Sequence, residues 1–182
     1  RNQKYQTTSG FFSNYNVSMP ILSDTNTLTN NYNYKIFKEL YENNVSTFAF
    51  SFQGASSISG DDIKLSERLY IPGRNLRGFE SGKIGPKDGS DFIGGNYVST
   101  INATTTIPKI LENVQSVDIV VFADAANIWG VDYDSSLDKS GIRSSVGVGL
   151  DWLTPVGPLT FSFAQPITKE STDIEETFRF NI

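Results

Sequence analysis

The sequence predicts an all-β protein, an antiparallel transmembrane β-barrel in which this chain supplies eight strands. Three observations lead to this fold class. Apolar and polar residues alternate in eight segments, and a period of two is typical of strands with one apolar and one polar face. Each segment has roughly 8 to 13 residues, close to the length that a tilted strand needs to cross a bilayer. The connections are alternately short and long, as in outer-membrane barrels.

The first three predicted strands carry many aromatic residues on one face. The third shows this best, because Phe48, Phe50 and Phe52 alternate with small or polar residues. In the first two, aromatic and aliphatic residues alternate with asparagine, serine and lysine. These strands are predicted at 10–21, 31–40 and 45–54.

The five later strands alternate in the same way. Pro108 ends the fourth strand, because proline cannot donate to a ladder. In the fifth, aliphatic residues lie opposite a face that contains Asp118 and Asp124, and in the sixth they lie opposite Arg143 and Asp151. These strands are predicted at 95–107, 117–129, 141–153, 159–167 and 178–182.

The connections predict which ends of the strands lie together. Short turns near 39–45, 108–116 and 154–158 fall at one end of the strands, and the loops near 22–30, 54–93, 130–141 and 168–176 at the other. Tyrosines and tryptophans are frequent near the strand ends, where an aromatic girdle is expected. These residues are Tyr32, Tyr34, Tyr97, Trp129, Tyr133 and Trp152.

Composition excludes several classes of function. The chain has 182 residues, which predicts one domain, and 38% of them are hydrophobic and 13% aromatic. A net charge of −5 without a basic patch argues against nucleic-acid binding. The absence of Cys and His removes thiol nucleophiles, the usual zinc ligands and the usual general base, so we expect neither an enzyme nor a cofactor. The chain begins at Arg1 rather than Met, and we expect it to be part of a longer precursor.

The stretch from 59 to 93 is the longest connection and is predicted to be neither strand nor helix. It holds six glycines and two prolines, and no periodicity runs through it. Its apolar residues are too many for a solvated segment, so we expect the loop to pack against the protein. Those residues are Leu69, Tyr70, Ile71, Leu76, Phe79 and Ile84.

The loop bears on the size of the barrel. A soluble β-sandwich also alternates, but its strands are often shorter. A closed barrel of eight strands has room inside only for its own side chains and could not also hold this loop. We therefore expect residues 1–182 to form half of a larger wall, with the partner of the first strand upstream of Arg1.

A set of short motifs resembles the BamA outer-membrane insertase family. The loop carries Leu-Arg-Gly-Phe-Glu-Ser at 76–81 and Ile-Gly-Pro at 84–86, similar to the Arg-Gly-Phe/Tyr loop of that family. Further blocks follow in order over almost the whole chain, at 94–96, 122–124, 147–152, 157–159, 163–166 and 178–182. The resemblance implies the C-terminal half of a sixteen-stranded barrel, without its N-terminal periplasmic domains and first eight strands.

The resemblance also implies a structural lock for the loop. Arg77, with Gly78 and Phe79, is expected to reach into the barrel and pair with Asp124 on the inner wall. The family commonly has a second acidic residue on the preceding strand, where this chain has Thr104, which leaves one carboxylate for the pair.

The final strand is expected to form the lateral seam of the barrel. In the family it pairs weakly with the first strand, and unpaired strand edges bind incoming strands. Here it would comprise Phe178, Phe180 and Ile182, and about four terminal residues of the family pattern are absent after Ile182.

The implied function is assembly and insertion of other barrels in the bacterial outer membrane, without enzymatic chemistry. The implied partners are outer-membrane lipids, unfolded outer-membrane protein clients and accessory lipoproteins of an assembly complex. Two alternatives remain open: a TamA-type or two-partner-secretion transporter of polypeptides, and a small self-contained barrel or sandwich that binds a ligand.

Two motifs carry weaker signals. Asp132, Asp134 and Ser136 hint at a calcium loop, but Leu137 replaces its glycine and Arg143 its final glutamate, so we expect no metal site. The two glycines at 147 and 149 precede no helix, and are expected where another group approaches the strand closely.

Overall fold

The computed structural model describes residues 7–20, 26–41, 44–107, 117–155 and 157–181. Its main feature is an eight-stranded antiparallel sheet in the order β1-β2-β3-β7-β8-β9-β10-β12. The eight strands lie where the alternation predicts them. They are β1 (Gly10–Ser18), β2 (Thr27–Tyr41), β3 (Asn44–Ser57), β7 (Tyr97–Ile107), β8 (Val117–Trp129), β9 (Arg143–Thr154), β10 (Gly157–Thr168) and β12 (Phe178–Asn181).

Several boundaries differ from the prediction, and the second strand differs most. β2 begins at Thr27 rather than residue 31, because Thr27 pairs with Ser57 and the ladder continues past the aromatic segment. The added residues of β2 are polar except for Leu28, and their partners on β3 are small, so the alternation shows little apolar contrast there. The predicted turn near 108–116 lies outside the described residues.

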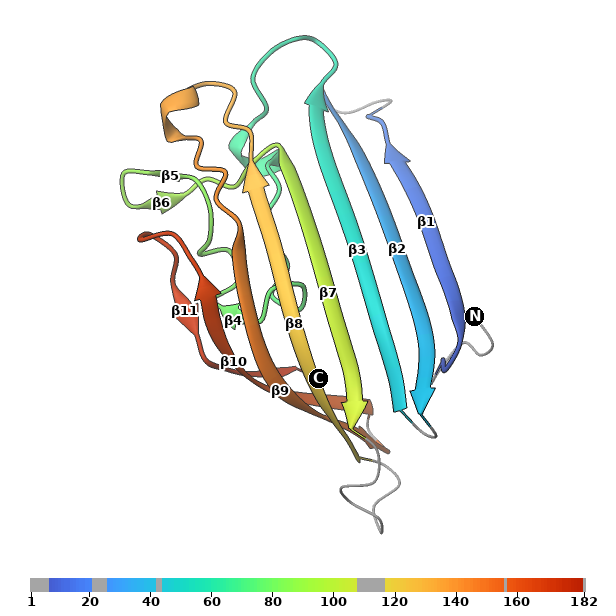
Figure 1. Ribbon diagram of the computed structural model, residues 1–182. Helices are drawn as coiled ribbons and strands as arrows, with labels where there is room; N and C mark the ends of the chain where they lie inside the picture. Colours follow the sequence, from blue (N-terminus) through green and yellow to red (C-terminus); the bar gives the residue numbers. More distant parts are fainter. Residues whose placement is uncertain (1–6, 21–25, 42–43, 108–116, 156, 182) are drawn as a thin grey trace.

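The sheet is a curved, open wall (Figure 1). β1 pairs only with β2 and β12 only with β10 among the described strands, so the sheet does not close on itself. The chain is therefore a partial barrel, and the hypothesis of a small self-contained barrel or sandwich is wrong. The long β3–β7 connection lies on the concave side of the wall (Figure 1).

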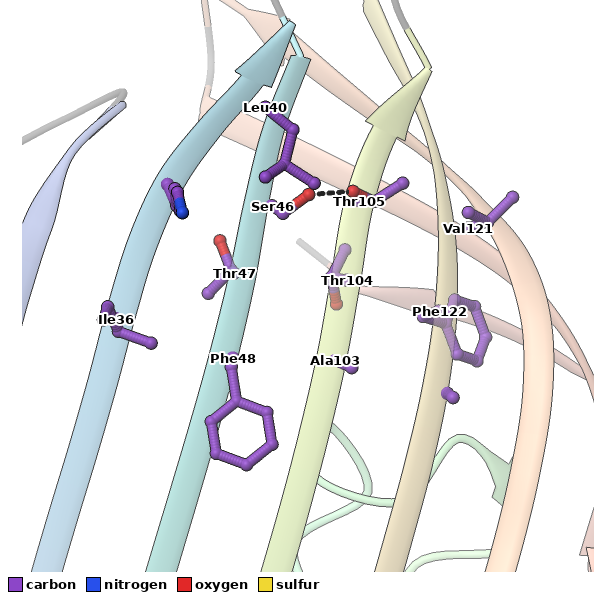
Figure 2. Close-up of a pocket in the computed structure, with 12 residues that line it drawn as sticks. Ile36, Leu40, Ser46, Thr47, Phe48, Ala103, Thr104, Thr105, Val121 and Phe122 are labelled. Atoms are coloured by element: carbon purple, nitrogen blue, oxygen red, sulfur yellow. Dashed lines mark hydrogen bonds between the residues drawn. The ribbon is translucent and has the colours of Figure 1, made fainter.

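The convex face of the wall is apolar, as predicted. Phe48 is 44% exposed there and Phe163 is 55% exposed, and Figure 2 shows Phe48 projecting away from its strand. Phe161 and Phe163 pair with Phe180 and Phe178 on the neighbouring strand, with ring centroids 4.9 Å apart in both pairs. Among the described residues, no helix is both long and apolar enough to cross a membrane.

The concave face is divided into two halves. In the half next to the long loops, four loop residues (Ile71, Leu76, Phe79 and Ile84) are buried against Val98, Ala126 and Ile128 of the wall. The half next to the short turns carries polar side chains, among them Lys35, Asp118 and Asp151. The inward face is therefore apolar where the loop packs against it, because the apolar residues of the loop require an apolar partner.

The connection predicted to lack regular structure contains several short elements. They are the 3₁₀ turn η1 (Leu65–Glu67) and the strands β4 (Gly78–Phe79), β5 (Lys87–Asp88) and β6 (Asp91–Phe92). β4 pairs with β11 (Glu175–Glu176), and a second 3₁₀ turn, η2 (Ser135–Leu137), lies in the β8–β9 loop. Two-residue strands are too short to show a period, which is why the sequence does not predict them. Tyr70 is 36% exposed, so it is not one of the buried anchors.

Candidate functional site: the loop lock

The tip of the long loop is held against the wall by asparagine side chains. A turn closes where the Asn75 N–H donates to the Pro72 carbonyl at 2.8 Å. Asn102 of β7 donates to the Asn75 carbonyl at 2.8 Å, and the Asn75 amide lies 3.3 Å from the Thr100 hydroxyl. These contacts fix the backbone just before Arg77.

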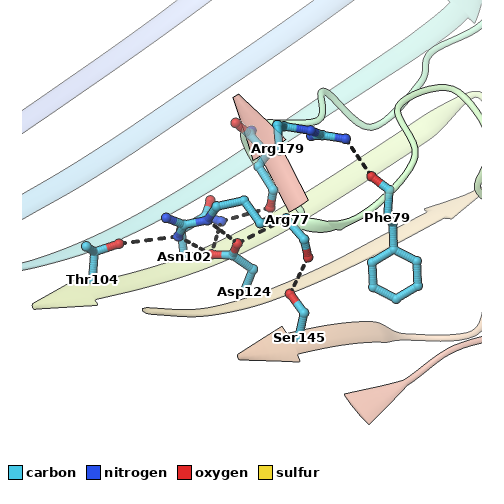
Figure 3. A network of polar contacts seen from close by, with 8 residues as sticks. Arg77, Phe79, Asn102, Thr104, Asp124, Ser145 and Arg179 are labelled. Atoms are coloured by element: carbon cyan, nitrogen blue, oxygen red, sulfur yellow. Dashed lines mark hydrogen bonds and ion pairs between the residues drawn. The ribbon is translucent and has the colours of Figure 1, made fainter. Parts of the chain in front are cut away.

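Arg77 and Asp124 are in direct contact, as the resemblance implies (Figure 3). Arg77 Nε lies 2.7 Å from Asp124 Oδ2, and Nη2 lies 2.8 Å from Oδ1. The Arg77 backbone N–H donates to Oδ2 at 3.1 Å, and Asn102 Nδ2 donates to Oδ1 at 2.8 Å. The Asp124 carboxylate is fully buried and receives four hydrogen bonds, so its desolvation is offset by charge-assisted bonds.

Phe122 also holds the arginine, which the sequence did not indicate. The Arg77 guanidinium carbon lies 3.4 Å from the centroid of the Phe122 ring, in a cation–π contact. A Cβ at Gly147 would lie 2.5 Å from that ring and 2.2 Å from the Phe163 carbonyl. Gly147 is therefore a position of close approach, as predicted, and it makes room for the ring under Arg77.

Thr104, which the resemblance expects at the position of the family's second acid, lies at the edge of the contact between Arg77 and Asp124. Arg77 Nη2 is 3.5 Å from its hydroxyl, the outer limit of a hydrogen bond. The direct neighbour of Asp124 across the β7–β8 ladder is Asn102, not Thr104. The amide of Asn102 thus takes over part of the polar support of the Asp124 carboxylate.

Gly78 has a backbone that only glycine adopts easily. Its φ is +91°, and an added Cβ would lie 3.2 Å from Ala164 and 3.3 Å from Ser145. The Ser145 hydroxyl donates to the Arg77 carbonyl at 2.5 Å. Gly78 therefore lets the loop touch the wall directly beside the ion pair, and the Phe79 side chain that follows is fully buried.

The loop lock is joined to the final strand of the wall. β4 forms a short ladder with β11, which directly precedes β12. Arg179 of β12 donates to the Phe79 carbonyl at 2.6 Å (Figure 3). Arg179 also pairs with Glu176. Gly73 leaves space for this guanidinium, since a Cβ there would lie 1.9 Å from Arg179 Nη1. Arg179 was not among the predicted site residues, although an arginine between two outward phenylalanines of a strand indicates a cation on the inward face.

The predicted seam residues are placed on the edge strand. Phe178 and Phe180 lie on the outer face of β12. Their rings pack against those of Phe163 and Phe161 on β10, respectively. Ile182 lies outside the described residues. The chain joins the ladder at Phe178, after β11, and among the described residues β12 pairs with β10 from Phe178 to Asn181.

A second buried ion pair lies near the long-loop end of β9. Arg143 Nε is 2.9 Å from Asp173 Oδ2 and Nη2 is 3.2 Å from Oδ1, and both side chains are fully buried. Asp173 also accepts the N–H groups of Gly85, at 3.2 Å, and Glu170, at 2.8 Å. This pair joins β9 to the β10–β12 loop, and the hydrogen bond from the Gly85 N–H attaches the long loop to the same carboxylate. Its signal in the sequence was Arg143 on the polar face of a predicted strand.

A third arginine–aspartate pair links the long loop to the β8–β9 loop, beyond the ends of the strands. Asp132 binds Arg68 and accepts the Ile63 N–H at 2.7 Å, and Arg68 lies over the Tyr133 ring at 5.0 Å. Burial alone raises the pKa of Asp132, but the hydrogen bonds from Ile63 and Asn96 and the charge of Arg68 outweigh it, so the pKa lies below its ordinary value. Asp134 instead accepts the Ser136 N–H at 2.9 Å.

The arrangement is suited to holding segments together. Among the described residues, no group of three or more acidic side chains is placed to bind a metal ion. Each carboxylate of the three ion pairs faces an arginine or a backbone N–H. The chemistry that these groups support is therefore the joining of the loop, the wall and the final strand.

The comparisons with known proteins agree on one family of outer-membrane barrel proteins. The model of the Omp85 superfamily domain matches residues 1–182. Of the similar sequences, the outer membrane protein assembly factor BamA of Neisseria meningitidis is 29% identical over 170 residues, covering 75% of this chain and 21% of that protein. A SAM50-like protein of Schizosaccharomyces pombe is 30% identical over 128 residues, covering 65% of this chain and 26% of that protein.

A solved structure matches nearly the whole chain. The crystal structure of BamA from Haemophilus ducreyi lacking POTRA domains 1–3 superposes with a TM-score of 0.89 at 27% identity. The match covers 98% of this chain and 39% of that one. The chain thus spans about a fifth of the length of the BamA sequence from Neisseria and well under half of the solved barrel protein.

Proposed function

Because this chain belongs to the Omp85 superfamily, a family of outer-membrane β-barrels without enzymatic activity, we propose that it assembles and inserts other β-barrel proteins. Its clients would be unfolded outer-membrane proteins, and its partners the surrounding lipids and accessory lipoproteins. We further propose that residues 1–182 form the C-terminal half of a sixteen-stranded barrel whose first strands and periplasmic domains lie upstream.

The observation that supports this proposal best is the joining of the loop lock to the edge strand. β12 has an outer edge that no described strand covers, and such an edge binds an incoming strand through backbone hydrogen bonds. The loop contacts the base of that strand through β4, β11 and Arg179. Arg77 and Asp124 therefore hold the edge strand in place while it receives a client strand, and the reaction needs no nucleotide.

The test replaces Arg77 in the full-length protein that contains this chain. Arg77→Ala leaves the buried Asp124 carboxylate without its cation, so we expect loss of loop protection against protease and a several-fold fall in assembled client barrels. The measurement is the level of heat-modifiable client barrels in cells that depend on the variant. Arg77→Lys keeps the charge but loses the bidentate geometry, so its level of client barrels is expected to lie between those of the unmodified protein and Arg77→Ala.

Arg74→Gln is the matched control, because Arg74 lies three residues away in the same loop and is exposed. Normal client levels and normal protease protection in Arg77→Ala would overturn the lock. A variant that left client barrels intact but stopped passage of one secreted polypeptide would favour the transporter function over assembly.

A further inference from the structure

The convex face of the wall carries a hollow that its strand register creates. One row across the sheet places Ile36, Phe48, Ala103, Ala123 and Val146 side by side from β2 to β9. Two alanines in register between larger neighbours leave a depression, which has a volume of about 540 Å³. That volume falls within the range of roughly 300–1,000 Å³ typical of small-ligand sites.

The floor of the hollow is apolar although it contains hydroxyl groups. In the next row towards the short turns, Ser46 and Thr105 face each other across the β3–β7 ladder. Their hydroxyls hydrogen-bond to each other (Figure 2). A hydroxyl that faces lipid needs such a partner, and the pair therefore presents mainly its carbon atoms to the hydrocarbon.

The residues at the two ends of the hollow show that it is elongated along the strands. Phe48 closes it towards the long-loop end, and Ile101 in the row beyond is 44% exposed. Leu40 lines the opposite end and is 55% exposed, close to the end of β2 at Tyr41. The hollow is therefore a groove that runs along the strands towards the short turns.

One charged residue stands at that end of the groove. Lys38 is the single charged side chain among the twelve described residues that line it, and it is paired in register with Ser46. It lies on the outer face of β2, three residues before the strand ends at Tyr41. A lysine near the end of a lipid-facing strand reaches the headgroup layer, where phosphate groups lie.

We propose that this groove binds one phospholipid of the leaflet at the short-turn end, with an acyl chain over Ala103 and Ala123 and its phosphate at Lys38. The short turns of outer-membrane barrels face the periplasm, so the lipid belongs to the inner leaflet. A protein partner fits less well, because the lining is apolar apart from hydroxyl groups and the single cation Lys38, and the wall faces the lipid of the membrane. The inference concerns the membrane-facing wall and does not depend on the proposed assembly function.

The test measures lipid retained by the full-length barrel. Protein purified in detergent is titrated with phosphatidylglycerol, or with diacylglycerol, which lacks the phosphate, and bound lipid is counted by native mass spectrometry. Lys38→Gln is expected to weaken phosphatidylglycerol binding about fivefold and leave diacylglycerol binding unchanged. Ala103→Phe fills the groove and is expected to weaken both.

Two variants serve as controls. Ala125→Phe adds the same bulk on the outer face of β8 two residues beyond Ala123 and outside the groove lining, and is expected to bind both lipids normally. Lys64→Gln removes a charge from the external loop and is expected to do the same. Heat-modifiable mobility checks that each variant is folded.

Three outcomes would overturn the proposal. Equal lipid retention in Ala103→Phe, Ala125→Phe and the unmodified protein would exclude the groove as the site. If folded Lys38→Gln bound phosphatidylglycerol as tightly as the unmodified protein does, Lys38 would not be the residue that contacts the phosphate. Crosslinking of a client polypeptide at Lys38 in place of lipid would assign the groove to another occupant.

Discussion

Two kinds of ion pair hold the long loop, and they differ in burial. Inside the wall, Asp124 and Asp173 have fully buried side chains, and each accepts four hydrogen bonds that include a bidentate arginine. Outside the wall, the side chain of Asp132 is 25% exposed, and Arg68 Nη1 has no hydrogen-bond partner among the described residues.

The difference shows how many hydrogen-bond partners a buried charge needs in comparison with a partly exposed one. A carboxylate removed from water must replace its hydration with several well-placed donors, and the removal of one partner leaves the other uncompensated. In the outer pair only the Asp132 carboxylate keeps part of its hydration, since the Arg68 side chain is 1% exposed, so the loss of the Asp132 charge is less costly than the loss of a fully buried one. We therefore expect the effects of substitution to fall in the order of burial.

The largest effect is expected at Asp173. Asp173→Ala leaves the Arg143 guanidinium buried without its anion and removes the acceptor of the Gly85 and Glu170 N–H groups. We expect a loss of about 3–5 kcal/mol in the free energy of unfolding. Urea unfolding in detergent, followed by intrinsic fluorescence, measures it. Asp91→Ala in the exposed β5–β6 hairpin is the control, and an equal effect in both variants would contradict the comparison.

An intermediate effect is expected at Arg179, whose side chain is 10% exposed. Arg179→Ala removes a charge-assisted hydrogen bond to the Phe79 carbonyl, at a cost of about 1.5–3 kcal/mol. It should also loosen the edge strand and the loop together.

The chain lacks cysteine, so single cysteines report on each segment separately. We expect faster thiol labelling of Ser81→Cys in the loop and of Asn181→Cys in β12 when Arg179 is replaced. Faster labelling at only one of the two positions would show that the segments move independently.

The smallest effect is expected at Asp132, and it depends on pH. The pKa of Asp132 is lower in the folded protein than its ordinary value, so the carboxylate stabilises the external loops above about pH 4. This contribution is lost as the pH falls through the lower folded pKa. Protease sensitivity of the β8–β9 loop between pH 7 and 3 measures it. Asp132→Asn should be equally sensitive across that range, and an unaltered pH dependence would contradict the assignment.

The sequence determined the wall. Strict alternation, as in 45–54 and 141–153, needs only neighbouring residues to reveal a strand with two different faces, and all eight strands lie where it predicts them. The pairing of Arg77 with Asp124 was implied by the resemblance to the family and not by the alternation, and the two side chains are in direct contact.

Only the tertiary structure decided what the interior contains. The apolar half of the concave face, the β4–β11 ladder and the Arg143–Asp173 pair all join segments that are distant along the chain. Alternation describes which residues share a face but not which loop packs against them. The physical reason is that burial of a charge or an apolar side chain depends on its spatial neighbours, and these exist only after the wall has curved around the loop.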